Sequence, residues 1–176
     1  SAEIQHTNGI ASRLEDTQAL LKQIDTEIRR IIYDLRQPIL DAKGLAPAIK
    51  QYIERCQTHA QLTCAIHISG VPYRLPAAVE IGIYRLVQEA MHNIIAHAGA
   101  EQASINLDFK ADHIHVAIHD NGSGFDPDII FNTPGEHMGL IGMKERALSI
   151  GGQLDIHTRR GGGTKLVLKV PLEQHV

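Results

Sequence analysis

From residue 62 onward, the apolar residues of this chain switch repeatedly between a spacing of two and a helical spacing. The helical spacing predicts helices over residues 76–98 and 140–150, the second of which ends at two glycines. Helices mixed with several antiparallel hairpins favour an α+β fold, a two-layer α/β sandwich in which helices cover one mixed sheet. The spacing of two predicts the strands of that sheet, at residues 62–68, 103–109, 114–118, 154–158 and 164–170.

A heptad pattern precedes this region. Apolar residues recur in alternating steps of four and three from Ile10 to Leu35, with Thr17 as the one polar member. A 3.5-residue period sustained in this way favours a long helix that self-associates as a coiled coil, so we expect a homodimer through the heptad helix. The alternative is an amphipathic helix that packs on its own domain.

The segment after the heptad helix is punctuated by Pro38 and Gly44. A second, shorter amphipathic helix is then indicated from Leu45 to Cys56. We therefore expect two units, a dimerisation helix over residues 1–40 and a catalytic globular domain over residues 41–176, with a hinge between them near residues 37–44.

Composition excludes several classes of partner. The net charge of -3 and the pI near 6.4 do not indicate the excess of basic residues that is typical of nucleic-acid-binding proteins. No apolar stretch approaches the roughly 18 residues of a membrane span, so we expect no membrane contact in this chain. Cys56 and Cys64 lack metal-ligand spacing, which favours free thiols and a reducing, cytoplasmic location. Because the chain opens with Ser1, we expect a fragment of a longer protein, which a membrane segment elsewhere could anchor.

Three polar residues share one stripe of the predicted helix at residues 76–98. Glu89, Asn93 and His97 follow one another in steps of four. A solvent-facing stripe is the simpler interpretation, but exposed helix faces commonly carry lysine or arginine, and this helix has neither after Arg85. An amide oxygen and a carboxylate one turn apart suit Mg²⁺ and an activated water or hydroxyl.

The stretch HDNGSGFDPD, residues 119–128, follows a predicted buried strand. Asp120 at the end of that strand could accept a hydrogen bond from an amino group such as adenine N6, and Gly122 and Gly124 would let the backbone approach a flat ring. A simple turn is the alternative. A calcium loop is excluded, because an EF-hand needs oxygen ligands at the positions that the two glycines occupy.

Further glycines follow a predicted long loop over residues 126–138, a length typical of lids. Gly139 and Gly142 lie at the start of the next helix, where free backbone N–H groups attract phosphate, although a flexible connector would have the same composition. The glycines of GGGTK, residues 161–165, could form only a hairpin turn. No GxxxxGK[ST] or GxGxxG segment occurs, so P-loop, Rossmann and protein-kinase phosphate sites are unsupported.

Taken in chain order, four segments resemble the sequence boxes of the Bergerat-type ATP-binding fold that sensor histidine kinases share with gyrase, MutL and ATP-driven chaperones. These are EAMHN, DNGSGF, GLIGM and GGGT. The flanking segments LRQPILDAKGLAPAI, LPAAVEIGIYRLVQ and KERA are similar to those of the histidine kinases that pair with NarL- and LuxR-type response regulators. The resemblance covers roughly residues 12–172.

The resemblance implies roles for individual residues. Asn93 would ligate Mg²⁺ on the triphosphate, and Glu89 would support the chemistry as a polar or basic partner. Asp120 would bind the adenine amino group, with Thr164 assisting through a water. Residues 126–138 would close over the phosphates. The remaining residues of the implied nucleotide site are His97, Gly122, Gly124, Gly139, Leu140, Gly142, Met143 and Gly163.

The implied function is that of the ATP-binding catalytic region of a two-component sensor histidine kinase, which transfers the γ-phosphoryl group of ATP to a histidine for relay to a response regulator. The heptad helix would be the second helix of its dimerisation hairpin. His6 is followed by Thr7 rather than an acid, so the acceptor histidine is expected on a helix outside this chain. The family's basic residue is replaced by Ala96, and its LRP segment reads LRQP. Alternatives are a nucleotide-gated dimerisation module without kinase activity and an anti-sigma-type serine kinase.

Overall fold

The computed structural model describes residues 38–126 and 138–172. These residues belong to a compact unit that spans residues 39–176. The heptad helix and most of the expected lid lie outside the described residues, and both remain predictions.

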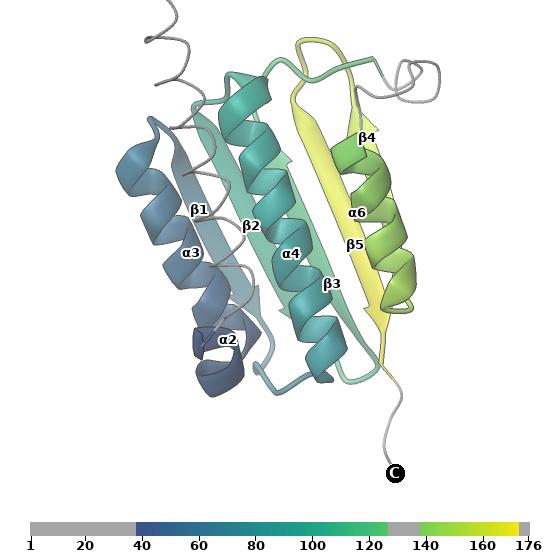
Figure 1. Cartoon of the computed structure of the whole chain (residues 1–176). Helices are drawn as coiled ribbons and strands as arrows, with labels where there is room; N and C mark the ends of the chain where they lie inside the picture. The colour runs from purple at the N-terminus through teal and green to yellow at the C-terminus, as the bar shows by residue number, and fades with distance from the viewer. Residues whose placement is uncertain (1–37, 127–137, 173–176) are drawn as a thin grey trace, which may run out of the picture. The chain divides into compact units, whose positions relative to one another are not determined.

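One mixed sheet forms the centre of this unit, with the strand order β1-β2-β3-β5-β4 (Figure 1). β1 and β2 are parallel, and the other neighbouring pairs are antiparallel. All the predicted strands are present, and their bounds are β1 Thr63–Ser69, β2 Gln102–Phe109, β3 His113–Asp120, β4 Gln153–Thr158 and β5 Thr164–Pro171.

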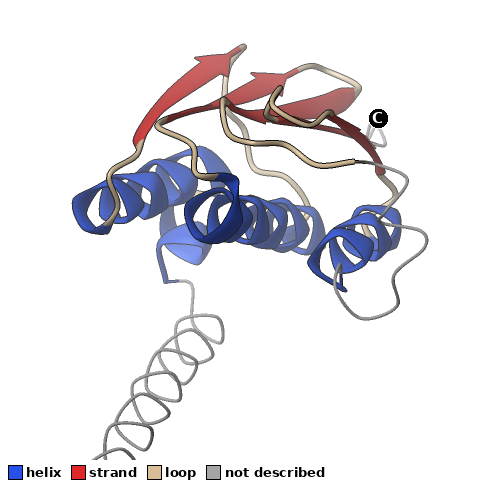
Figure 2. Cartoon of the chain, turned by 90° about the horizontal axis from the view of Figure 1, so that it is seen from above, coloured by secondary structure: helices blue, strands red, loops and turns tan. Residues whose placement is uncertain are grey.

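The helices that the structure describes lie on one face of the sheet, which confirms the predicted two-layer α+β sandwich (Figure 2). The predicted helix at residues 76–98 is an α-helix that changes into a π-helix in its last turn. The bounds are α2 Pro38–Lys43, α3 Leu45–His59, α4 Ala77–Asn93, the π-helix η1 Ile94–Ala98, and α6 Met138–Ser149.

Residues 38–43 form the short helix α2, where the sequence pattern indicates only a hinge. Proline is favoured in the first turn of a helix because its missing N–H group needs no partner there. The helix ends at Gly44, whose φ of 81° is left-handed and whose N–H group donates to the carbonyl of Leu40 at 2.9 Å. A glycine with a positive φ commonly ends a helix. Here the chain continues directly into the next helix, α3, at Leu45.

The hydrophobic core lies between the sheet and the helices. α4 contributes Ile83, Val87 and Met91, each with no exposed surface. They belong to the same core cluster as the inward-facing residues of the central strands, such as Ile105 of β2. Ile68 at the end of β1 is 42% exposed, although it continues the alternation that contains the buried Cys64. β1 is an edge strand, so fewer neighbours cover its apolar side.

The two cysteines are free thiols, as the sequence predicts. Burial raises the pKa of Cys64 to about 11 and also raises the pKa of the half-buried Cys56. Both thiols are therefore protonated at neutral pH. Separately, none of the helices in the described residues combines the length and apolar character that a membrane crossing requires.

A buried ion pair joins the start of α4 to α2. Glu80 is 1% exposed and accepts hydrogen bonds from Arg74 Nε at 3.1 Å and Nη2 at 3.0 Å, and from the Leu75 N–H group at 3.2 Å. Arg74 also donates from Nη1 to the carbonyl of Asp41 at 3.0 Å. A buried carboxylate needs such partners to offset its desolvation.

We expect Arg74→Ala to destabilise the domain, because it leaves the Glu80 carboxylate buried without its cation. The side chain of Arg74 is 56% exposed, so water lowers the penalty to about 2 kcal/mol. Urea denaturation measures this change. Arg160→Ala is the matched control, because Arg160 is 74% exposed and lies 3.9 Å from Asp126, and we expect a loss below about 0.5 kcal/mol. Equal losses in the two variants would contradict the role of the buried pair.

Candidate nucleotide-binding site

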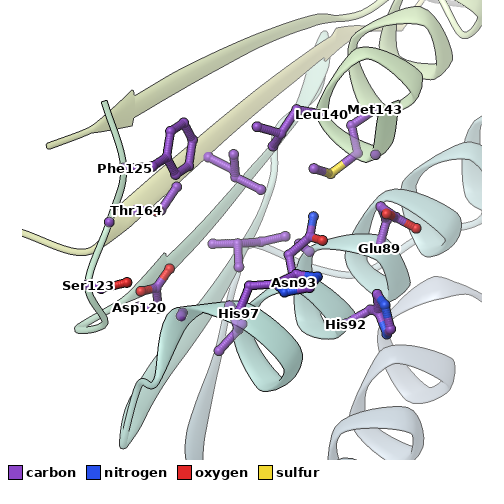
Figure 3. Close-up of a pocket in the computed structure, with 17 residues that line it drawn as sticks. Glu89, His92, Asn93, His97, Asp120, Ser123, Phe125, Leu140, Met143 and Thr164 are labelled. Carbon is purple, nitrogen blue, oxygen red and sulfur yellow. The ribbon is translucent and has the colours of Figure 1, made fainter. Parts of the chain in front are cut away.

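A pocket of about 570 Å³ opens between the helices and one end of the sheet (Figure 3). Its walls come from α4, η1, β3, β5, α6 and the segment after β3. Most of the site residues implied by the sequence resemblance line this pocket, although they are far apart in the chain. They are Glu89, Asn93, His97, Asp120, Gly124, Gly139, Leu140, Met143 and Thr164.

Asp120 is the polar residue at one end of the pocket. It is the last residue of β3 and only 3% exposed, and its Oδ1 atom accepts a hydrogen bond from the Gly122 N–H group at 2.8 Å. Thr164, the first residue of β5, is its cross-strand partner. The short backbone bond orients the carboxylate, so that it presents a fixed acceptor beside a threonine hydroxyl.

Gly122 and Gly163 lie next to Asp120 but do not line the pocket. A Cβ atom on Gly163 would overlap the carbonyl oxygen of Asp120, and one on Gly122 would overlap the carbonyl oxygen of Ala98. The N–H group of Gly163 donates to the carbonyl of Gly122 at 2.9 Å. These glycines allow the backbone to pack closely where the carboxylate is held.

Gly142 differs from the other predicted glycines. It lies in the second turn of α6 and does not line the pocket, and a Cβ atom there would meet no described residue within 4 Å. By contrast, a Cβ atom on Gly139, in the first turn, would lie 2.5 Å from Glu89 Oε1. The start of α6 therefore approaches α4 at Gly139.

Glu89 and Asn93 form the polar part of the pocket on α4. They lie one turn apart and both line the cavity, with Gly139 beside them (Figure 3). The side chain of Asn93 makes no hydrogen bond to the part of the chain that the structure describes, so its amide oxygen is available to a ligand or a cation. A carboxylate and an amide oxygen are hard donors of the kind that Mg²⁺ accepts.

His92 on α4 is an additional histidine in the pocket that sequence reasoning missed. His92 and His97 both line the cavity, and their rings meet edge to face with centroids 6.1 Å apart. Residues five apart lie on different sides of an α-helix, but the i→i+5 hydrogen bonds of η1 realign them. The sequence does hold a signal for His92, because it follows Glu89 by three residues and residues at that spacing share one face of an α-helix.

The rest of the pocket surface is largely apolar and includes further residues that sequence reasoning did not identify. Ile118 and Leu166 come from β3 and β5, and Phe125 follows the DNGSG segment. The Phe125 N–H group donates to Thr158 Oγ1 at 3.1 Å, which ties this segment to β4. Apolar walls next to one oriented carboxylate suit a flat heteroaromatic ring. The other lining residues outside the predicted set are Ala90, Ile94, Ala98 and Ser123.

Comparison with known families agrees with this geometry. Residues 78–174 match the model of the histidine kinase-, DNA gyrase B-, and HSP90-like ATPase family, a range that includes every residue of the predicted site. The chain belongs to this ATPase family. Membership implies ATP binding, and the matched range contains α4, β3, α6 and β5, which form most of the pocket.

Two relatives of this ATPase domain are described as histidine kinases. The chain is 37% identical over 172 residues to the signal transduction histidine-protein kinase/phosphatase DegS of Brevibacillus brevis, covering 96% of this chain and 44% of that protein. It is 30% identical over 168 residues to an uncharacterized sensor-like histidine kinase of Chloroflexus aurantiacus, covering 92% of this chain and 28% of that protein. The chain thus spans less than half the length of these relatives.

The fold of the ATPase domain also occurs in solved histidine kinase structures. The blue-light activated histidine kinase of Erythrobacter litoralis EL346 superposes with a TM-score of 0.65 over 88% of this chain and 51% of that chain. At 19% sequence identity, this likeness concerns the fold. It agrees with the mixed sheet and one-sided helix layer described above.

A pair of glycine substitutions tests how the site is built. We expect Gly163→Ala to destabilise the domain by about 2 kcal/mol or more, because φ is 67° and the new methyl group overlaps the Asp120 carbonyl. Gly142→Ala fills open space within a helix and should stabilise it by about 0.5–1 kcal/mol. Both changes are measured by urea denaturation. Destabilisation by Gly142→Ala would show that this glycine has a packing role in the apo domain.

Proposed function

We propose that residues 41–176 are the catalytic ATP-binding domain of a two-component sensor histidine kinase. The observation that carries the proposal is the placement of polar groups in the pocket. One oriented carboxylate, Asp120, lies at one end, and the pair Glu89 and Asn93 lies at the other. Apolar walls lie between them. ATP has the same order of chemical groups, an amino-bearing flat ring followed by an anionic chain.

The adenine ring would lie at the Asp120 end. Asp120 Oδ1 is occupied by the Gly122 N–H group, which leaves Oδ2 to accept a hydrogen bond from the adenine amino group. Thr164 lies opposite Asp120 in the sheet and would assist through a water. Met143 is 1% exposed and lines the pocket, so it would contact the face of the ring.

The triphosphate would then extend towards Glu89, Asn93 and the start of α6. Asn93 would hold a Mg²⁺ ion through its amide oxygen, and phosphate oxygens and waters would supply the other ligands that such an ion prefers. The described residues contain no group of three His, Cys, Asp or Glu side chains that could hold a metal ion, so phosphate would be needed to complete the coordination. The ion would offset the charge on the transferring group.

In the proposed reaction, a ring nitrogen of an acceptor histidine attacks the γ-phosphorus in line. The N–P bond forms as the bond to the β,γ-bridging oxygen breaks, and ADP leaves. Glu89 would orient the acceptor or accept its ring proton, because its carboxylate lies at the phosphate end of the pocket. The acceptor histidine would belong to the dimerisation hairpin.

The partners of the domain follow from the same proposal. The heptad helix would pair with that of a second copy, and the phosphoryl group would pass to a response regulator of the NarL/LuxR type. The relative from Brevibacillus brevis, a histidine-protein kinase, supports a kinase over the alternative of an anti-sigma-type serine kinase. We place the domain in the cytoplasm, where ATP is available.

Two substitutions test the proposed nucleotide site. We expect Asp120→Asn and Asn93→Asp each to weaken binding of Mg-ATP at least about tenfold, the first by changing the acceptor for the adenine amino group and the second by adding negative charge beside the phosphates. Isothermal titration calorimetry measures the affinity. Asp155→Asn and Asn106→Asp are exposed, matched controls, and they should bind like the wild type. Unchanged affinity in both site variants would refute the assignment.

Kinase activity is tested with an acceptor supplied separately. Incubation with γ-labelled ATP and a fragment that carries the dimerisation hairpin of a related kinase should yield acid-labile, alkali-stable phosphohistidine on that fragment. Glu89→Gln should slow the transfer about 100-fold or more while ATP affinity stays near that of the wild type. ATP binding without any transfer would favour the nucleotide-gated dimerisation module.

A further inference from the structure

We infer that His92 is a nucleotide-binding residue that donates a hydrogen bond to the phosphate chain. This inference rests on the proposed function, because it takes the direction of ATP in the pocket from Asp120 and Asn93. It adds a residue that lies outside the set implied by the sequence boxes.

The position of His92 points to the phosphates rather than the base. His92 lines the pocket beside Glu89 and Asn93, at the end away from Asp120 (Figure 3). With the adenine amino group at Asp120, the anionic chain lies at the His92 end. The side chain is exposed, so a ligand can reach its ring without displacing core residues.

The basic side chains of the pocket give the second argument. Among its described lining residues, none is lysine or arginine, and the two histidines are the only basic side chains. The pocket also contains the carboxylates of Glu89 and Asp120. The position before His97 is Ala96, which supplies no donor. Polyphosphate binding requires donors, and the imidazole N–H groups of His92 and His97 can supply them beside the amide group of Asn93.

The π-helix explains how both imidazoles serve the same ligand. The turn Ile94–Ala98 brings His97 to His92, with ring centroids 6.1 Å apart and an interplanar angle of 89°. Neither ring hydrogen-bonds to another described residue, so both keep a donor for an anion. The edge-to-face contact places the two rings next to each other in the same pocket.

The test separates phosphate contacts from base contacts by titrating ADP and adenosine in parallel. We expect His92→Ala to weaken ADP binding about tenfold and to change adenosine binding less than about twofold, because the nucleoside lacks the phosphates. His92→Lys retains a donor and should bind ADP within about threefold of the wild type. His67→Ala, an exposed histidine of β1, is the control and should bind both ligands normally.

The possible results distinguish this inference from the proposed function. ADP affinity unchanged by His92→Ala would overturn the inference and leave the proposed function intact. Equal losses for ADP and adenosine would also overturn it, because they would indicate that His92 supports the pocket structure. A wild-type domain that binds neither ligand would refute the proposed function and the inference together.

Discussion

The burial of α4 against the sheet is the interaction on which the site depends. Val87, Ala90 and Met91 are at most 2% exposed, and they anchor the same turns that carry Glu89 and Asn93. A helix held by its apolar face has a fixed rotation, and its remaining face then has a fixed direction. Hydrophobic packing therefore sets the direction of Glu89 and Asn93 at this end of the pocket.

At the other end of the pocket, the sheet fixes the position of Asp120, the last residue of β3. Ile118 lies two residues before Asp120 on β3, so the two side chains lie on the same face of the strand. β3 thus carries a core residue, Ile118, and a site residue, Asp120, on the same face. The carboxylate is buried to 3% exposure because the backbone of Gly122 and Gly163 closes around it, and this close packing requires residues without a Cβ atom.

Much of the fold was predictable from the sequence because burial imposes a periodicity on each element. The strands and the helices α3, α4 and α6 follow from it, and so does the single helix layer. The pattern is less informative where burial is partial or where an element is short. Ile68 continues an apolar alternation yet is exposed at an edge strand, and residues 38–43 form a helix too short to show a period. Neither feature leaves a pattern that a spacing rule can detect.

The sequence by itself determined the ATPase family and the candidate residues for its chemistry, namely Glu89, Asn93, Asp120 and the glycine segments, because these residue types occur in one order along the chain. Only the tertiary structure decided which of them meet in one cavity and what else joins them. Phe125 enters through a bond to Thr158, and His97 meets the ring of His92 where α4 continues into the π-helix. Both depend on contacts or backbone hydrogen bonds that form only when distant strands and successive turns are in place, and no spacing in the linear chain records them.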